Sequence, residues 1–393
     1  MAFEVESTGA LARRVSLHKE APSGVTLREV PELSGKSSTT CSASELLCWM
    51  GWLTAGPPSL TAEALRTAGA WALLRYFWAL GYNPRGAVVP TEEATAIRNH
   101  NRVSFSEAVG VGVGGQLAVS AIAPGGPVLV ANLDDAIHLL RSTGLVSTAS
   151  SASKLPDYLL ASLGPAGWRL MAVECKGTVG DLSTSVEQMA RGVKQVQALS
   201  SRLPLRRLVF GAALHLDGGE KREVKAYAVE VGAARGAKEP MEELPSAVLD
   251  AALVRGLRCA GMHELADSVR AEGVPPGGLP LPQVEENLDP IARRQMMGAS
   301  AVWRLADGDV RAELGIDLEM LRALAAEQGS REDRVREVLE RSSQRGHRTR
   351  ENSVEHLMPD GIGLRLAWSA DIRPPSPASI ERERRDSNPR PPA

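Results

Sequence analysis

The stretch that decides the fold is WRLMAVECKG, residues 168–177, which follows a Pro-Asp pair at 156–157. Its apolar middle, Leu-Met-Ala-Val, is typical of a buried strand that leads directly into Glu174. Side chains on a strand alternate between the two faces of a sheet. The spacing therefore predicts Glu174 and Lys176 on one face and Cys175 on the other, with Asp157 at the neighbouring strand.

This combination of residue types suits one kind of chemistry. Two carboxylates, Asp157 and Glu174, together with the backbone carbonyl of Cys175 form a set of hard oxygen ligands of the kind that Mg²⁺ prefers. A lysine two residues beyond the second acid can orient or deprotonate an attacking water, or stabilise charge on phosphate oxygens. Lys176 has that position.

The pattern resembles the PD-(D/E)XK nuclease superfamily, which has the restriction-endonuclease-like fold, over Ser104 to Val231, about a third of the chain. After the first acid, that superfamily uses the order strand, strand, helix, strand. The sequence follows the second acid with a turn at 177–180, a helical stretch from about 183 to 201, and strand-like runs at 207–214 and 224–231. A strand at 128–132 is expected upstream.

The resemblance implies an α/β fold with a restriction-endonuclease-like mixed sheet flanked by helices. The sequence pattern on either side of it predicts additional mainly helical N- and C-terminal regions. It implies a nuclease that hydrolyses DNA phosphodiester bonds with Mg²⁺, or Mn²⁺ in its place. The implied catalytic residues are Asp157, Glu174, Lys176 and Gln188. The implied metal ligands are Asp157, Glu174, the Cys175 carbonyl and, on the helix before the sheet, Glu107. That helix, at 105–113, is an unfavourable one, since each glycine inside it costs about 1 kcal/mol relative to alanine.

Several of these residues also have an ordinary structural interpretation. A Glu-X-Lys at a strand end is usually a solvated ion pair, and Pro-Asp usually begins a turn or a helix. Gln195 competes with Gln188 for the role of the helix glutamine that reaches the attacking water or a phosphate. Asp134 and Asp135 are predicted to cap a helix rather than to hold a metal.

Composition limits the class of protein. With 393 residues the chain has room for two or three domains, and 43% hydrophobic with 23% charged residues is ordinary for a globular protein. The four cysteines show no CxxC pair, which argues against a zinc ribbon and a disulfide scaffold. The start has no export signal, and the apolar stretch 62–81 contains charges, so we expect a cytoplasmic protein without a membrane span.

The net charge of −2 hides a segregated basic run. Between residues 188 and 216 there is no acid, and the basic residues are Arg191, Lys194, Arg202, Arg206 and Arg207. Arg191 and Lys194, on the helix after the Glu-X-Lys, are predicted to contact a nucleic-acid backbone, with salt-sensitive affinity and no base readout. The alternative is a solvated basic face. Aromatic residues, at 4%, are too few for stacking platforms.

Breaks in composition divide the chain into seven segments. They are an N-terminal arm or small β element (1–41), a helical region (42–100), the nuclease-like core (101–235), a helical extension (236–273), a Pro/Gly linker (274–288), a mainly helical C-terminal region (289–370) and a disordered tail (371–393). Within the C-terminal region, helices are expected at 290–297, 313–328 and 331–342, and a strand at 363–368.

The tail contains the peptide Asp386-Ser-Asn-Pro389, which is what the strand opposite a tRNA T-arm encodes. A neighbouring tRNA gene is a favoured insertion point for mobile elements, which suggests restriction or phage defence as the setting. No GxxxxGK[ST] motif is present, so a protein partner would have to supply translocation or targeting. The alternatives are a non-cleaving DNA- or partner-binding protein of the same fold, and a helical scaffold.

Overall fold

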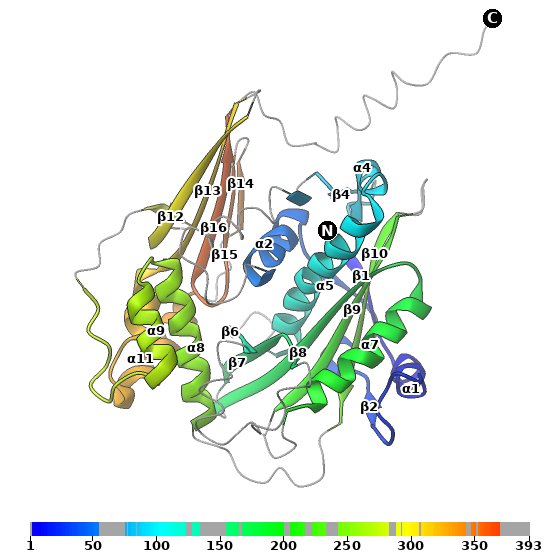
Figure 1. The fold of residues 1–393 in the computed structure, drawn as a ribbon, viewed down its shortest axis with the longest axis horizontal. Coiled ribbons are helices and arrows are strands. Elements are labelled where there is room, and N and C mark those ends of the chain that lie inside the picture. Colours follow the sequence, from blue (N-terminus) through cyan, green and yellow to red (C-terminus); the bar gives the residue numbers. More distant parts are fainter. Residues whose placement is uncertain are drawn as a thin grey trace, which may run out of the picture.

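A computed structural model describes residues 2–54, 75–76, 78–83, 85–122, 128–133, 155–164, 167–199, 205–216, 222–232, 243–282, 288–291, 293–305, 308–342, 347–350 and 353–369. Three predictions lie outside these residues: the helix that begins at Asp134, most of the apolar helix at 62–81, and the tail at 371–393. Elements are labelled as in Figure 1.

A mixed sheet forms the centre of the molecule (Figure 1). Within the described residues it has eight strands, and seven of them lie in the order β3, β1, β10, β9, β8, β7, β6, while the short β2 pairs with β10. The strands β8 and β9 are parallel, as are β1 and β10, and the other neighbours are antiparallel. Their bounds are β1 Ala2–Ser7, β2 Leu27–Arg28, β3 Gly35–Thr40, β6 Val128–Asn132, β7 Tyr158–Gly164, β8 Gly167–Val179, β9 Arg206–His215 and β10 Glu223–Val231.

Helices cover both faces of this sheet, so the core has three layers. On one face lie α2 (Ala43–Thr54) and α5 (Asn99–Ile122), and on the other lie α1 (Gly9–Ser16) and α7 (Leu182–Gln197) (Figure 1). Helix α7 begins with a side-chain cap from Asp181 and buries an apolar stripe against β9 and β10, as its 3.6-residue periodicity requires. The mixed sheet and the strand and helix order predicted for 128–231 are confirmed.

Helix α5 is much longer than the predicted segment 105–113. Its glycines do not end the helix, because they allow it to pack closely against its neighbours. A Cβ on Gly110 would collide with the backbone of Gly177 in β8, and one on Gly112 would lie 2.7 Å from Met50 Cγ in α2. The helix therefore uses glycine on both sides to approach a strand and a helix closely. Close packing against two neighbours offsets the helix-propensity cost of the glycines.

Of the two alternatives for residues 1–41, the arm is wrong and the β element is confirmed, because this segment belongs to the core. Strand β1 pairs with β10 and β3 pairs with β1, so the segment forms one edge of the central sheet. Phe3 and Val5 are buried. The short helix η1 (Pro31–Leu33) follows β2.

The predicted mainly helical C-terminal region is also wrong, because most of it is a second sheet. This sheet is antiparallel, in the order β11, β12, β13, β16, β15, β14. The segment 290–297, predicted as a helix, is part of two paired strands, and 313–328 begins as a strand. Bounds are β11 Leu288–Ile291, β12 Arg294–Leu305, β13 Gly308–Asp317, β14 His347–Arg350, β15 Ser353–Leu357, β16 Ile362–Trp368, α10 Leu318–Leu324 and α11 Gln328–Ser342. Pairing of β12 and β13 over ten residue pairs overrides the local helix propensity of these segments.

Helices α8 (Glu243–Cys259) and α9 (His263–Glu272) confirm the predicted helical extension. Helix α8 contacts strands of both sheets, and α9 packs against α8 (Figure 1). The segment predicted as a free linker is docked over its described part, 274–282: the N–H of Leu279 donates to the carbonyl of Ala325 at 2.8 Å. Trp168 Nε1 donates to Glu332 of α11 at 2.9 Å, which ties the start of β8 to this second region.

The remaining elements are a small hairpin of β4 (Leu80–Tyr82) and β5 (Val88–Pro90) and the short helix α4 (Glu92–Thr95). None of the helices in the described ranges combines the length and the apolar character that a membrane span requires.

Candidate active site

The two predicted acids meet where β7 begins. The pairing of β7 with β8 starts at Tyr158 opposite Val173, so Asp157 lies just before one strand and Glu174 just beyond the paired part of the other. Side chains and backbone replace the missing ladder bonds. The N–H of Cys175 donates to Asp157 Oδ2 at 2.9 Å, and the N–H of Asp157 donates to Glu174 Oε2 at 3.1 Å. These reciprocal bonds hold the two carboxylates side by side.

The predicted alternation of faces is confirmed. A Cβ built on Gly192 of α7 would lie 3.0 Å from Glu174 Cγ and 3.6 Å from Lys176 Cε, so both side chains face this helix. The thiol of Cys175 points to the opposite face, where it packs against Gly114 of α5. Only the backbone of Cys175 is on the side of the acids.

Burial makes the charge of Glu174 costly. Its side chain is fully buried, and it forms an ion pair with Lys176, whose side chain is 22% exposed. Desolvation, and next the charge of Asp157, raise the pKa of Glu174 to about 8, although Lys176 and the hydrogen bond from Asp157 act in the opposite direction. A carboxylate of this kind ionises readily only if additional positive charge is supplied.

The donor set fits a hard divalent cation. Asp157 and Glu174 present carboxylate oxygens, and the carbonyl of Cys175 points to the same side of β8 as its N–H, toward Asp157 rather than toward β9. In the part of the chain that the structure describes, no group of three or more His, Cys, Asp or Glu side chains could hold a metal. The site therefore offers two acids and a carbonyl, which leaves open positions for water, as Mg²⁺ sites usually do.

The two glutamines of α7 have different surroundings. Gln195 Nε2 donates to the carbonyl of Leu155 at 3.0 Å, two residues before Asp157. Gln188 is partly buried and lies one turn before Gly192 on the same helix face. Among the described residues, it makes no side-chain hydrogen bond. The structure thus commits Gln195 to a backbone contact and leaves Gln188 available.

Glu107 is not placed with the other two acids. It lies on α5, and its backbone packs close to Gly177, but its side chain is exposed. Its charge contributes to the raised pKa of Tyr76, whose main cause is burial. Nothing in this arrangement brings its carboxylate to Asp157.

The basic residues predicted to contact nucleic acid form ion pairs with acids from elsewhere in the sequence. Arg191 Nη2 lies 2.6 Å from Glu187, one turn earlier on α7. Lys194 lies 3.2 Å from Glu20, in the loop after α1, and Arg191 Nε lies 3.9 Å from the same carboxylate. The run is therefore basic in sequence but locally neutralised in space.

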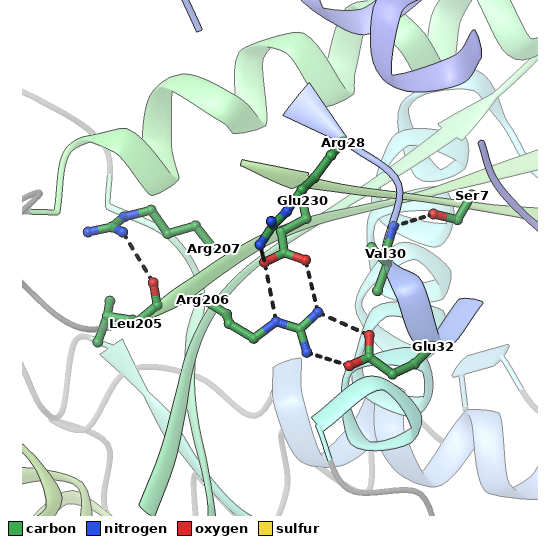
Figure 2. A network of polar contacts seen from close by, with 8 residues as sticks. All are labelled: Ser7, Arg28, Val30, Glu32, Leu205, Arg206, Arg207 and Glu230. Atoms are coloured by element: carbon green, nitrogen blue, oxygen red, sulfur yellow. Dashed lines mark hydrogen bonds and ion pairs between the residues drawn. The ribbon is translucent and has the colours of Figure 1, made fainter. Parts of the chain in front are cut away.

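Figure 2 shows that Arg206 is neutralised more completely. Its guanidinium makes two hydrogen bonds to Glu32, at 2.8 and 3.0 Å, and two to Glu230, at 3.3 and 2.9 Å. Glu230 is buried and accepts a further bond from Arg28 at 2.7 Å. Arg207 is buried and donates to the carbonyl of Leu205 at 3.2 Å. Arg206 thus links β9 to the N-terminal segment, whereas the bond of Arg207 stays within its own segment.

Sequence reasoning missed the glycines that shape the site. Gly192 lets α7 approach Glu174 and Lys176, and Gly110 and Gly177 bring α5 onto the strand that carries both residues. Gly192 interrupts an otherwise good amphipathic helix, and that interruption was an available signal of close approach.

Comparison with known proteins gives no relative. No protein-family model matches the chain, and neither a curated protein nor a solved structure matches it. The evidence for the α/β architecture and for the geometry of the site therefore comes from this chain alone.

Proposed function

We propose that the chain is a Mg²⁺-dependent nuclease that hydrolyses DNA phosphodiester bonds, with a restriction-endonuclease-like core. The observation that carries the proposal is the hydrogen-bonded pair of Asp157 and Glu174, with Lys176 on the same face of β8. The order β7, β8, α7, β9 after the first acid also supports it, since the superfamily that the motif resembles uses that order.

The roles of the residues follow from their positions. Asp157 and Glu174 would hold Mg²⁺ together with the carbonyl of Cys175, and the backbone N–H groups of Asp157 and Cys175 fix the two carboxylates for this purpose. Bound there, Mg²⁺ would supply a Lewis acid for a phosphate oxygen and a lower pKa for an attacking water. Mn²⁺ has similar ligand preferences and is the expected substitute.

Lys176 is the residue that can act on the substrate directly. Its ammonium group is partly exposed while the carboxylate beside it is fully buried, so it lies on the solvent side of the pair. From that position it can donate to a non-bridging phosphate oxygen or orient the attacking water. Gln188, with no hydrogen bond to another described residue, is the second polar group of this face available to water or phosphate.

A cleavage assay tests the proposal directly. Supercoiled plasmid is incubated with the protein and Mg²⁺, Mn²⁺ or EDTA. Asp157→Asn, Glu174→Gln and Lys176→Met should each reduce the cleavage rate by at least about a hundredfold without unfolding the chain. The three residues act as a unit, so removing any one of them should remove most of the activity that they provide together. Cys175→Ser should cleave normally, since only the backbone of Cys175 faces the acids, although its buried hydroxyl should lower the melting temperature.

A control is Glu187→Gln, which changes an exposed carboxylate of α7 that pairs with Arg191. If this variant loses as much activity as Glu174→Gln, the assignment of the acids is wrong. Metal-dependent DNA binding without cleavage in the unmodified protein would favour the alternative function, a non-cleaving DNA- or partner-binding protein of the same fold.

The cellular setting that we propose is restriction or phage defence. It rests on the tail peptide 386–389, which lies outside the described residues. Sequencing the DNA that follows the reading frame tests it: a tRNA gene on the opposite strand is expected, and its absence would remove the reason for this setting.

A further inference from the structure

Among the described residues, the segment that carries Asp157 makes few backbone hydrogen bonds. Leu155, Pro156 and Asp157 precede β7 and belong to no strand. Pro156 has no N–H to donate. The carbonyl of Asp157 accepts from the N–H of Leu133 at 3.0 Å, and the carbonyl of Leu155 accepts from Gln195 Nε2 at 3.0 Å.

The bond from Gln195 crosses from α7 to this segment. Gln195 lies three residues after Gly192, so the two share one face of the helix. Gly192 packs on Glu174 and Lys176, whereas Gln195 holds the backbone two residues before Asp157. One helix face therefore contacts the surroundings of both acids, although Glu174 is on β8 and Asp157 lies in the segment before β7.

We propose that Gln195 is the positioning residue for Asp157, an inference that rests on the proposed role of Asp157 as a metal ligand. Gln195 acts through the backbone of Leu155 and does not touch substrate or metal. Its hydrogen bond fixes the position of residues 155–157 relative to β8. It thereby maintains the 2.9 Å contact between Asp157 Oδ2 and the N–H of Cys175. Ligands are useful only when they are held within about 0.5 Å of the productive position.

The test compares Gln195→Met with Gln197→Met. Both substitutions remove a glutamine amide from the last turns of α7 and keep the side-chain length, but Gln197 is exposed. Two quantities are measured on the full chain: hydrogen exchange of the Cys175 amide without metal, and the affinity for Mn²⁺ alone by calorimetry. In Gln195→Met, exchange at Cys175 should accelerate roughly tenfold, and Mn²⁺ should bind about tenfold more weakly.

A third readout separates positioning from general damage. In Gln195→Met, the Mn²⁺ concentration that gives half-maximal cleavage should rise, while the rate at saturating Mn²⁺ recovers most of the unmodified value. Gln197→Met should match the unmodified protein in all three measurements.

Equal Cys175 exchange in the two variants overturns the positioning role, whatever the protein does to DNA. Failure of the proposed function looks different: the unmodified protein then does not cleave DNA, while Cys175 exchange still distinguishes Gln195→Met from Gln197→Met. If exchange accelerates in Gln195→Met but Mn²⁺ affinity is unchanged, Asp157 is not a ligand and the inference fails at that step.

Discussion

A Cβ on Gly192 would lie 3.0 Å from Cγ of Glu174, closer than almost any real side chain approaches another. The same Cβ would lie 2.9 Å from Val209 Cγ1, in a strand that cannot move away. Helix α7 therefore packs against Glu174 through Gly192, a residue without a side chain. This contact gives the first prediction.

Gly192→Ala should destabilise the protein by about 1–2 kcal/mol and reduce cleavage. Overpacking in a filled core typically costs 1–3 kcal/mol, which exceeds the gain of about 1 kcal/mol in helix propensity. Gly329→Ala is the matched control, because Gly329 is also in a helix but has open space around it, and it should be neutral or stabilising. Urea unfolding measures both. A stabilised Gly192→Ala would mean that α7 does not rest on Glu174.

The stability of the metal-free protein should depend on pH through Glu174. Its pKa is raised from 4.5 to about 8 by burial and by Asp157, so the folded protein holds this proton more tightly than the unfolded chain. The resulting stabilisation is complete below pH 4.5 and is lost as the pH rises to about 8. The total change is on the order of 5 kcal/mol.

The measurement is the difference in unfolding free energy between the unmodified protein and Glu174→Gln at several pH values. That difference should change across this window and become flat above about pH 8. Affinity for Mg²⁺ should show the opposite trend and rise with pH up to about 8, because the cation binds the ionised carboxylate. A difference that is flat between pH 5 and 8 contradicts a raised pKa.

Glu20→Gln should increase DNA affinity if α7 contacts the phosphate backbone. Glu20 pairs with Lys194, so its neutralisation frees this cation for a phosphate, while Arg191 keeps its pair with Glu187. The slope of log affinity against log salt should steepen by about 1, whereas Arg191→Glu and Lys194→Glu should flatten it. Glu93→Gln, an exposed acid on α4, is the control. Equal slopes for all these variants would leave this face as a solvated helix surface.

Glu230→Gln should destabilise the fold by about 2 kcal/mol, because hydrogen bonds to charged partners contribute about 1.5–3 kcal/mol. Glu230 is buried and accepts bonds from Arg206 and Arg28, so its loss removes the charged acceptor that these two arginines share (Figure 2). Glu223→Gln changes an exposed acid on the same strand and should be nearly neutral. Thermal unfolding of the two variants gives the comparison.

Strands β8, β9 and β10 of the central sheet were predictable because their signals are local, whereas the edge strands β1 and β3 were not. Apolar runs bounded by turn residues gave β8, β9 and β10, and alternation along β8 gave the common face of Glu174 and Lys176. The order of the elements along the chain then gave the position of α7. None of these features requires knowledge of a distant contact.

The C-terminal sheet was missed although β13 carries a clear period of two. Val310, Ala312, Leu314 and Ile316 are all buried, and they alternate with residues of the other face. The charged residue Glu313 made the segment read as the start of a helix. In the fold Glu313 is itself buried and pairs with Arg365 on the neighbouring β16 at 2.7 Å, a partner 52 residues away that local propensity cannot reveal.

The same limit applies to the surface charge. Arg191, Lys194 and Arg206 form a basic run only along the sequence, because Glu20, Glu32 and Glu230 reach them through tertiary contacts. The pairing of Gln195 with Leu155 is likewise a non-local contact. The sequence predicted that Gln188 and Gln195 of α7 are both near the acids, but it could not distinguish their roles.

The contact between Gly110 and Gly177 makes the two halves of the site unequal in their freedom to move. Where α5 meets β8, backbone rests on backbone, so no rotamers lie beneath the strand that could repack and absorb a displacement. Glu174 and Lys176 are carried on that strand and share its fixed position. Any adjustment of the site to a metal or to a bent nucleic-acid strand must then come from movement of Asp157. Its segment lies outside the strands and has few backbone donors, so it is the part of the site that is free to shift.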